Sequence, residues 1–415
     1  MSWNFTPPTD SELGDREVPR DGNHLQGKRI ALLITGGIAA MKAPLIARAL
    51  RRQGAEVVAF TSEDALRYVT IDALEWSTIN PVITRLTAAA EHLSDRSPFD
   101  VYLVAPATYN TINKFRHGIA DGVISSALAS ALGRMERGKT KILIVPTMHG
   151  SLHNSILTES LKTLDRMGVS IMSPRDDYGK HNLPGEKELA IEICRLVSES
   201  PLKDRSILVT GGPTPVEIDS IRRLTNRFTG RLGASITEEL YLSGADAFLL
   251  HGRGSYEPPS YLPHRIVETY DEYLAGVMEE LDKKSYLGGI FSAAVADYRP
   301  DRVLSGKTPS GGALNRIDLV PTGKVIEKVR ERFPALYMMT FKYQEGVSHG
   351  ELMAIARDRL ARGYQAVIAN RGEETGENGE QVAYLVTESG ESPKMVGKKA
   401  IARSIVEHLE RVPGQ

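Results

Sequence analysis

Short, continuous apolar runs alternate with longer segments of helical periodicity along most of this chain. The first run, residues 28–35, leads into Gly36 and Gly37, and helical spacing then extends over residues 38–53. Continuous apolar runs are typical of strands buried on both faces, and their alternation with helices predicts a parallel, doubly wound sheet. Further strands of this first series are expected at residues 56–61, 99–105 and 140–145.

The same alternation starts again after residue 205. A run at residues 206–210 leads into Gly211 and Gly212, and a helix is expected at residues 230–242. The later strands are expected at residues 245–250, 287–291, 335–341, 365–369 and, as an added edge strand, 382–386. Because 415 residues exceed one ordinary domain, we predict two α/β domains, each with a doubly wound, mainly parallel sheet. The predicted divisions are a polar N-terminal tail at 1–27, a first domain at 28–198, a linker at 199–205 and a second domain at 206–415.

The composition is that of a soluble globular protein, with 41% apolar residues, 25% charged residues and a net charge of −1. Such a balance gives no reason to expect a nucleic acid or membrane partner, so any phosphate binding must be local. Residues 1–27 lack the apolar segment of a signal peptide and no run reaches transmembrane length, which predicts a cytoplasmic protein. The single cysteine, Cys194, excludes an intrachain disulfide and lies in a helical pattern typical of a buried structural thiol.

Small and polar residues follow several of the expected strands. In open α/β sheets, ligands bind outside the carboxyl ends of the strands, and small side chains let backbone N–H groups approach a phosphate. The segment 292–300, with Lys307 beyond it, is the most informative of these strand ends because Asp297 and Arg299 add charge to small residues. An ordinary polar loop is the alternative interpretation of each such segment.

Other motifs are excluded by their spacing. Neither half contains G-x-G-x-x-G, so the dinucleotide fingerprint is absent. The Gly306-Lys307-Thr308 segment resembles the end of a Walker A loop, but Asp301 stands where the loop requires its first glycine. His149 and His153 are four residues apart, without a third ligand or an intervening glutamate, so we predict no metal site there.

In the first half, residues 105–114 and 118–121 resemble the flavin-binding family that oxidatively decarboxylates cysteine groups, whose coenzyme A branch acts on phosphopantothenoylcysteine. The resemblance implies a flavodoxin-like domain that binds FMN, with the FMN phosphate near the first strand–helix turn. His92 lies at the spacing of the family's active-site histidine and would act as the base that helps the thiol transfer electrons to the flavin. The implied cofactor contacts are Gly36, Gly37, Ala39, Thr61, Ser62, Ala105, Pro106, Ala107, Thr108 and Asn110.

The first half departs from this family in two places. His149 stands where the family has an asparagine that holds the substrate carboxylate, a role that histidine can also perform as a donor. Residues 173–184 correspond to a flexible clamp that carries a cysteine in the coenzyme A branch, and here they contain none. Cys194 lies beyond the clamp in a predicted helix. Two alternatives therefore stay open, a decarboxylase of another thiol and a non-catalytic flavin-binding scaffold.

The second half, residues 205–409, resembles phosphopantothenate–cysteine ligase. Residues 208–214 match the family's first nucleotide loop, residues 224–233 match its asparagine-containing signature, and residues 293–300 match without a substitution. Phe228 and Thr229 replace two serines of the signature. The resemblance implies that Asn226 contacts the acyl-nucleotide intermediate and that Lys307 is the catalytic lysine. The implied nucleotide and substrate contacts are Gly211, Gly212, Thr214, Thr229, Gly230, Ala293, Ala294, Asp297, Arg299 and Asn370.

Together, these resemblances imply a two-step ligation that belongs to coenzyme A biosynthesis. A carboxylate of 4′-phosphopantothenate attacks the α-phosphate of a nucleoside triphosphate, and the amine of cysteine then attacks the acyl nucleotide. The cosubstrate is CTP or ATP, a choice that the sequence leaves open, and Mg²⁺ is expected with it. The resemblance also implies a homo-oligomer, with trimeric flavin domains and dimeric ligase domains.

Overall fold

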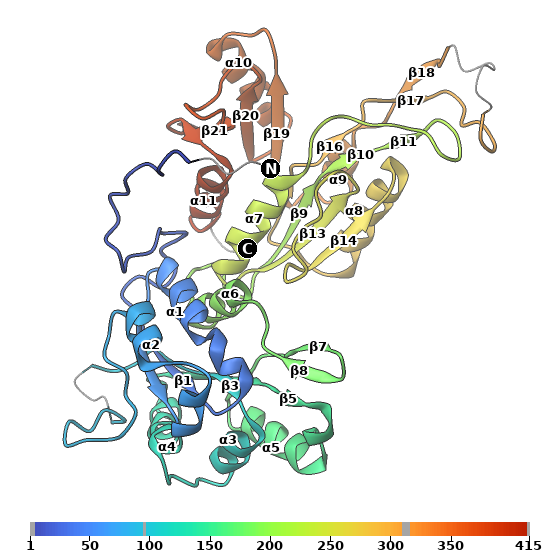
Figure 1. Ribbon diagram of the computed structural model, residues 1–415. Coiled ribbons are helices and arrows are strands. Elements are labelled where there is room, and N and C mark those ends of the chain that lie inside the picture. Colours follow the sequence, from blue (N-terminus) through green and yellow to red (C-terminus); the bar gives the residue numbers. More distant parts are fainter. Residues whose placement is uncertain (1–4, 94–96, 309–315, 413–415) are drawn as a thin grey trace. The chain divides into compact units, whose positions relative to one another are not determined.

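A computed structural model describes residues 5–93, 97–308 and 316–412 of the chain. The chain separates into two compact units, Met1–Ser198 and Glu199–Gln415 (Figure 1). Each unit is built around its own sheet and hydrophobic core, so each is described by itself.

The first unit contains a five-stranded parallel sheet in the order β2-β1-β3-β4-β6. In chain order its strands run 2-1-3-4-5, which is the flavodoxin-like arrangement of a doubly wound sheet. Its strands are β1 (Arg29–Ile34), β2 (Glu56–Thr61), β3 (Val101–Ala107), β4 (Lys141–Pro146) and β6 (Ser170–Ile171). The switch point, where the direction of winding reverses, lies between β1 and β3. Because ligands bind in the crevice that forms at such a point, a ligand site is expected at the carboxyl ends of β1 and β3.

Helices and a small antiparallel sheet complete the first unit. The apolar runs of β1 and β3 are almost wholly buried, as expected for central parallel strands. Residues 38–53 form a short 3₁₀ helix followed by an α-helix. The elements are η1 (Ile38–Lys42), α1 (Ala43–Arg52), η2 (Glu63–Arg67), α2 (Ile71–Thr78), α3 (Tyr109–Arg116), α4 (Val123–Met135), β5 (Met148–His149), η3 (Gly150–Leu152), α5 (Ser155–Arg166), β7 (Arg175–Asp177), β8 (Lys180–Asn182) and α6 (Glu186–Val197).

Part of the predicted N-terminal tail belongs to the first unit's core. Val18 and Leu25 are buried, although the tail as a whole is polar. The N–H of Leu25 donates to the carbonyl of Gln53 at 2.8 Å, and the N–H of Asp21 donates to the carbonyl of Arg52 at 2.9 Å. This segment therefore caps the end of α1, where helix carbonyls need donors.

The second unit contains a larger sheet in the order β14-β13-β9-β15-β19-β20-β21-β22. The first six strands are parallel and run 3-2-1-4-5-6 in chain order, the Rossmann arrangement, and β21 adds to them in the antiparallel direction. The switch point lies between β9 and β15. The strands are β9 (Ser206–Gly211), β13 (Asp246–Gly252), β14 (His264–Val267), β15 (Gly288–Phe291), β19 (Tyr337–Gln344), β20 (Ala366–Arg371), β21 (Val382–Thr387), β22 (Gly390–Glu391) and β23 (Met395–Val396).

Five helices and three short strand pairs surround this sheet in the described part of the second unit. The helices are α7 (Arg231–Leu242), α8 (Tyr270–Lys283), α9 (Val325–Arg332), α10 (His349–Ala361) and α11 (Lys398–Leu409). The paired short strands are β10 (Pro213–Thr214) with β16 (Ala294–Val295), β11 (Val216–Glu217) with β12 (Arg223–Leu224), and β17 (Tyr298–Pro300) with β18 (Leu319–Pro321).

The segment 199–205, expected as a linker, packs against the second unit. Leu202 is buried in that unit's core, and the Ser200 hydroxyl donates to a carboxylate oxygen of Glu410 at 2.6 Å. The N–H of Asp204 donates to the carbonyl of Gly244 at 3.1 Å. These contacts fix the start of the second unit several residues before its first strand.

Candidate functional site

The second unit has a pocket of about 820 Å³ at the carboxyl ends of β9, β15, β19 and β20. This is the switch point of the sheet, where ligands bind in doubly wound folds. Most of the residues predicted for this site line the pocket, namely Gly212, Asn226, Thr229, Gly230, Ala293, Ala294, Asp297 and Asn370. The pocket therefore brings together strand ends that are more than a hundred residues apart in the sequence.

Glycines bring the N-terminus of α7 close to the end of β9. Gly230, the residue before the first turn of α7, has φ = 80°, and Gly212 has φ = 76°, both in the left-handed region that favours glycine. A Cβ added to Gly233 would lie 2.9 Å from the Cα of Gly211. The unpaired N–H groups of the first helical turn consequently face the pocket, as in phosphate-binding loops.

Replacing Gly230 with alanine is expected to destabilise the second unit by about 1–3 kcal/mol, because the new side chain would be strained and would collide with His251 and the backbone of Gly212. Thermal unfolding of the full chain measures this effect. Gly350→Ala is the matched control, since Gly350 lies in α10 with no positive φ and no atom within 4 Å of an added Cβ. Equal stability of the two variants would contradict the close approach of α7 and β9.

Asn226 connects two walls of the pocket. Its Nδ2 donates to the carbonyl of Ala294 at 2.6 Å, and its Oδ1 accepts from the N–H of Phe228 at 3.2 Å. The side chain therefore holds the 224–229 loop against the 293–297 segment, and both lie along the pocket.

Hydrogen bonds to two buried threonines hold the 293–297 segment in place. The N–H of Ala296 donates to the hydroxyl of Thr214 at 2.9 Å, and the N–H of Ala293 donates to the hydroxyl of Thr210 at 3.3 Å. Thr214 and Gly211 thus lie behind the residues that line the pocket and do not line it themselves. Asp297 lines the pocket and forms an ion pair with Lys324, a partner on the loop before α9.

Two charged residues expected in this site lie elsewhere. Arg299 lines a smaller cavity of about 230 Å³, where its guanidinium is 4.0 Å from the carboxylate of Asp271. Lys307 is exposed and does not line the large pocket. The chain turns into β17 after Asp297, which directs the residues that follow away from the strand end.

Buried Asp219 anchors the loop that carries Lys307. Its carboxylate accepts from the N–H groups of Ile221 at 3.0 Å, Arg222 at 2.8 Å and Thr308 at 3.3 Å. Hydrogen bonds from these N–H groups, with that of Ile221 the strongest, hold the pKa of Asp219 well below its usual range despite burial. Asp219 is therefore ionised at neutral pH and fixes the residue next to Lys307.

Most of the positive charge in the pocket comes from residues that were not predicted from the sequence. Residues beyond the recognised motifs contribute the cations Lys324, Lys342, Arg359, Arg371 and Lys398. Lys342 and Arg371 lie at the carboxyl ends of β19 and β20. Because ligand sites form at the carboxyl ends of such strands, both residues could have been predicted from the sequence. Arg359 belongs to α10, and its position gives no such signal.

In the first unit, the three predicted strand-end segments converge. The hydroxyl of Thr35 donates to the carbonyl of Pro106 at 2.7 Å and accepts from the N–H of Thr108 at 3.3 Å. The N–H of Ser62 donates to the carbonyl of Ile34 at 3.0 Å. A Cβ on Gly36 would collide with the Cβ of Asp64, so glycine is needed where the first turn meets the end of β2. The switch point of this sheet is thus closely packed.

Free N–H groups remain at this switch point. Within the described residues, the N–H groups of Gly36 and Gly37 make no hydrogen bond, and they precede η1, which contains Ala39. Thr108 caps α3 through a hydroxyl that accepts from the N–H of Thr111 at 3.5 Å. Thr61 is buried, Asn110 is exposed, and Ala105 and Ala107 are buried in β3. The backbone of the first turn therefore offers the donors that a phosphate group requires.

His92 lies on the loop between α2 and β3. Its Nδ1 is buried and has no hydrogen-bond partner among the described residues. Within those residues, His92 forms no hydrogen bond with the first turn or with residues 105–110. His149 is exposed on β5, and its Nδ1 lies 2.8 Å from the hydroxyl of Ser151. The two histidines therefore lie on separate segments, His92 on a loop and His149 on β5.

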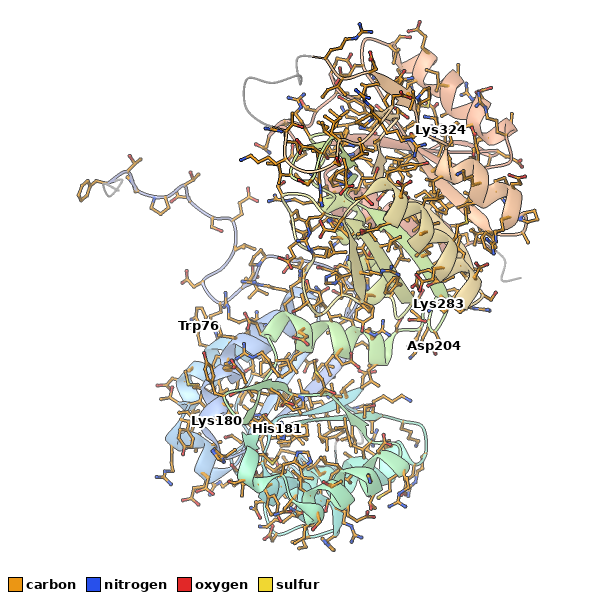
Figure 2. All side chains as sticks on the ribbon, turned by 90° about the vertical axis from the view of Figure 1, so that its right-hand side faces the viewer. Trp76, Lys180, His181, Asp204, Lys283 and Lys324 are labelled. Atoms are coloured by element: carbon orange, nitrogen blue, oxygen red, sulfur yellow. The ribbon has the colours of Figure 1, made fainter. Side chains whose placement is uncertain are left out.

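The region expected as the clamp forms the hairpin β7–β8, which pairs with β5. His181, labelled with Lys180 in Figure 2, has its Nδ1 2.5 Å from a carboxylate oxygen of Asp176 and its Nε2 2.7 Å from Nδ1 of His153. A carboxylate and two imidazoles thus lie together at the hairpin that the resemblance equates with the clamp. Cys194 is buried in α6, in agreement with the prediction of a structural thiol.

The fold and these strand-end sites define a two-domain α/β protein in which a flavodoxin-like unit precedes a unit with Rossmann strand order. Models of the flavoprotein family and of the DNA/pantothenate metabolism flavoprotein C-terminal domain match residues 19–198 and 202–412. The chain belongs to the family of bifunctional coenzyme A biosynthesis proteins. None of the helices in the described ranges has the length and apolar character needed to cross a membrane.

Relatives match both units. The coenzyme A biosynthesis bifunctional protein CoaBC of Thermococcus kodakarensis is 33% identical over 395 residues, which cover 94% of this chain and 96% of that protein. The protein of the same name from Methanocaldococcus jannaschii is 28% identical over 391 residues, with 94% of each chain covered. A solved structure of the DNA/pantothenate metabolism flavoprotein from Streptococcus pneumoniae is 26% identical and covers 50% of this chain and 98% of its own, with a TM-score of 0.44.

Proposed function

We propose that the second unit joins 4′-phosphopantothenate to cysteine in a nucleotide-dependent ligation of coenzyme A biosynthesis. The membership of the chain in the bifunctional family supports this function. The observation that carries the proposal is the pocket at the switch point, with Asn226 and residues 293–297 on its walls.

In the proposed reaction, the carboxylate of 4′-phosphopantothenate attacks the α-phosphorus of CTP or ATP and pyrophosphate leaves. The amine of cysteine then attacks the acyl carbon, an amide bond forms, and the nucleoside monophosphate leaves with the electron pair of the broken bond. The fixed N–H groups at the start of α7 and the cations of the pocket would stabilise the negative charge on the phosphoryl oxygens. Lys307 is the lysine that the resemblance assigns to this role.

Mg²⁺ would be held mainly by the nucleotide. The carboxylates of Asp297 and Glu374 line the pocket, but each already forms an ion pair, with Lys324 and Arg371 respectively. Because Mg²⁺ in such sites usually takes water and substrate phosphates as most of its ligands, these carboxylates need not supply a complete set.

For the first unit, we propose FMN-dependent decarboxylation of phosphopantothenoylcysteine. FMN held there would supply two-electron redox chemistry, as an acceptor for the electrons of the thiol that is restored when the decarboxylated intermediate is reduced. The free N–H groups of Gly36 and Gly37 would hold a phosphate, and the 105–110 loop would lie along the flavin. His92 would remove a proton from the thiol, and His149 would donate to the substrate carboxylate.

The absence of a cysteine from the β7–β8 hairpin favours a second candidate function for the first unit. In that case the unit decarboxylates another thiol substrate or serves as a non-catalytic flavin-binding scaffold. The ligase proposal does not depend on which of these is correct. We also propose that the protein is a cytoplasmic homo-oligomer that acts on small molecules.

One set of measurements on the full chain tests both units. Pyrophosphate release that requires 4′-phosphopantothenate, cysteine and either CTP or ATP would support the ligase. A flavin absorbance spectrum and carbon dioxide release from phosphopantothenoylcysteine test the first unit. A colourless protein with active ligase would favour a scaffold without flavin chemistry, and absence of nucleotide-dependent ligation would contradict the main proposal.

Asp219→Asn is expected to slow the proposed ligation about tenfold or more, because a neutral side chain holds the Thr308 N–H and the Arg222 guanidinium less strongly. Since the pKa of Asp219 is lowered in the folded state, its contribution to stability is present at neutral pH and is lost as pH falls through that lowered pKa. The variant should therefore lose stability relative to the wild type at pH 7 and approach it in acid. Unchanged kcat and an unchanged pH profile of stability would contradict the anchoring role.

A further inference from the structure

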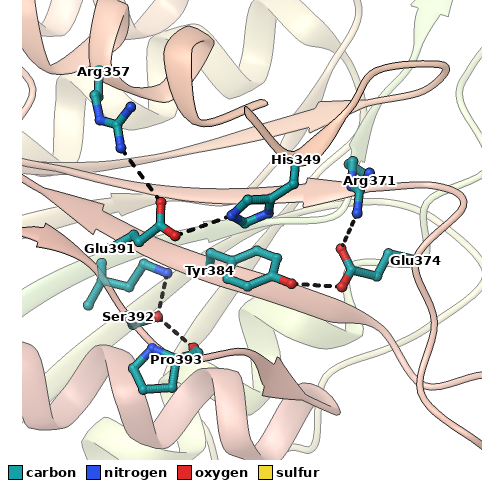
Figure 3. Close-up of polar contacts among 9 residues, drawn as sticks. His349, Arg357, Arg371, Glu374, Tyr384, Glu391, Ser392 and Pro393 are labelled. Carbon is teal, nitrogen blue, oxygen red and sulfur yellow. Dashed lines mark hydrogen bonds and ion pairs between the residues drawn. The ribbon is translucent and has the colours of Figure 1, made fainter. Parts of the chain in front are cut away.

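His251 is a buried histidine near the carboxyl end of β13, in the second unit. Its exposed fraction is 0%, and among the described residues neither of its ring nitrogens has a hydrogen-bond partner. The three other histidines of this unit each have a polar partner. Figure 3 shows one of them, His349, whose Nε2 lies 3.2 Å from a carboxylate oxygen of Glu391. Because a buried, unpaired polar group costs free energy, its presence in His251 calls for a functional explanation.

The ring of His251 fills the space between the end of β9 and the start of α7. A Cβ added to Gly230 would collide with Cε1 of the imidazole, and a Cβ added to Gly211 would lie 3.2 Å from its Nδ1. These two positions therefore make room for the ring because they carry no side chain. Gly230 lines the pocket and His251 does not. The imidazole thus lies directly behind the backbone that presents the free N–H groups of α7.

The surroundings of His251 favour its neutral form. Burial is the main cause that lowers its pKa; the backbone of Tyr256 opposes this effect, and repulsion from His264 on β14 adds to it. The ring centre of Tyr256 lies 6.2 Å from that of His251, and the guanidinium of Arg231, at the start of α7, lies 5.4 Å from the Tyr256 ring. No carboxylate of the described residues contributes to the shift in pKa. The positive end of the α7 dipole also disfavours an imidazolium, so the ring stays neutral at neutral pH until a negative charge comes near.

We propose that His251 is a positioning residue of the nucleotide site, which takes up a proton from the solvent when phosphates bind at the start of α7. The inference rests on the proposed ligase function for the identity of its ligand, the triphosphate of the nucleotide. Phosphate oxygens held by the first N–H groups of α7 bring negative charge to the opposite side of the backbone at Gly230, and a nearby negative charge favours the protonated imidazole. By reciprocity, the protonated ring strengthens the binding of the phosphates.

This linkage between proton and nucleotide fixes the sign of the pH dependence. Because the pKa of His251 is higher in the bound state, the gain in affinity is complete below the pKa of the free protein. The gain is lost as pH rises through the pKa of the bound protein. Between these two limits, uptake of one proton changes the Kd by about tenfold per pH unit.

Calorimetry on the full chain tests the proposal by counting protons. CTP, ATP and inorganic pyrophosphate are titrated in two buffers of different ionisation enthalpy, from about pH 5 to about pH 8, the range in which histidine changes its charge. We expect the wild type to take up more protons than His251→Leu, by up to about one per chain, because proton exchange by the ligand itself is the same in both proteins. The variant should bind about tenfold or more weakly in acid, the effect of a shift of about one pKa unit or more, and as tightly as the wild type at the alkaline end.

His349→Gln is the matched control, because His349 is directed at Glu391 and does not line the pocket (Figure 3). It should take up as many protons as the wild type. Thermal unfolding checks the fold of His251→Leu, whose Tm should be no lower than that of the wild type because the substitution removes buried, unpaired nitrogens. NMR titration of His251 in the unsubstituted chain needs no variant, and its pKa should be higher with pyrophosphate than without.

Pyrophosphate separates this inference from the proposed function. If pyrophosphate raises the pKa of His251 while no ligation is detected, the coupling of the proton to phosphate binding stands and the proposed function fails. If ligation is normal, but folded His251→Leu takes up as many protons as the wild type and pyrophosphate leaves the pKa of His251 unchanged, the inference is overturned and the proposed function survives. If neither a nucleotide nor pyrophosphate binds to the wild type, both are wrong.

Discussion

Replacement of Lys307 by glutamine should slow pyrophosphate release by about 10²–10³-fold, the usual effect of removing one group that stabilises transition-state charge. Negative charge develops on the oxygens of the pentavalent phosphoryl group, and an ammonium group lowers the free energy of that state more than a neutral amide can. Lys307 is exposed and makes no ion pair among the described residues, so the free energy of unfolding should be unchanged. Steady-state kinetics with CTP and ATP measure the loss, and thermal unfolding checks the fold.

Lys328→Gln provides the control for this experiment, since Lys328 is an exposed lysine of α9 that does not line the pocket. Lys307→Arg keeps the charge and should retain more activity than Lys307→Gln. Near-wild-type turnover of Lys307→Gln would contradict the assignment of Lys307 as the catalytic lysine. A large loss in Lys342→Gln alone would then indicate that the pocket wall supplies the cation.

Much of the fold follows from the alternation of apolar runs and helices. The runs at residues 28–35 and 206–210 became the central strands β1 and β9, because a strand buried on both faces must be apolar throughout. The fold class, two doubly wound α/β sheets, is confirmed. Strand β14 was missed since it is short, lies at the sheet edge and includes His264 and Arg265, so neither periodicity nor hydrophobicity marks it.

The candidate site in the second unit could be predicted only where strand ends form it. Asn226 and Asp297 belong to segments with recognisable motifs, and both line the pocket. Arg299 shares its motif with Asp297, yet the antiparallel pairing of β17 with β18 carries it to another cavity. Arg359 was not predicted because its contact with the carbonyl of Phe341 depends on how α10 packs against the sheet, which a single sequence does not specify.

The clamp region shows a different limit. Its lack of cysteine is visible in the sequence, but the chain of Asp176, His181 and His153 depends on the pairing of β8 with β5 and β7. Those residues are separated by up to 28 positions, and no local pattern connects them. Tertiary structure was therefore needed to find this group of interacting side chains.

If His92 is the base of the first unit, His92→Asn should reduce carbon dioxide release from phosphopantothenoylcysteine by about 10²–10⁴-fold, the usual contribution of general acid–base catalysis. Asparagine can still donate and accept hydrogen bonds, but it cannot take a proton from the thiol. Bound flavin, measured by absorbance, should be retained because the N–H groups of Gly36 and Gly37 are unaffected. His117→Asn is the control, since His117 is an exposed histidine at the end of α3. Decarboxylation that survives His92→Asn would exclude His92 as the base, and His153 and His181, two imidazoles in contact of which His181 also contacts the carboxylate of Asp176, would be the next candidates to replace.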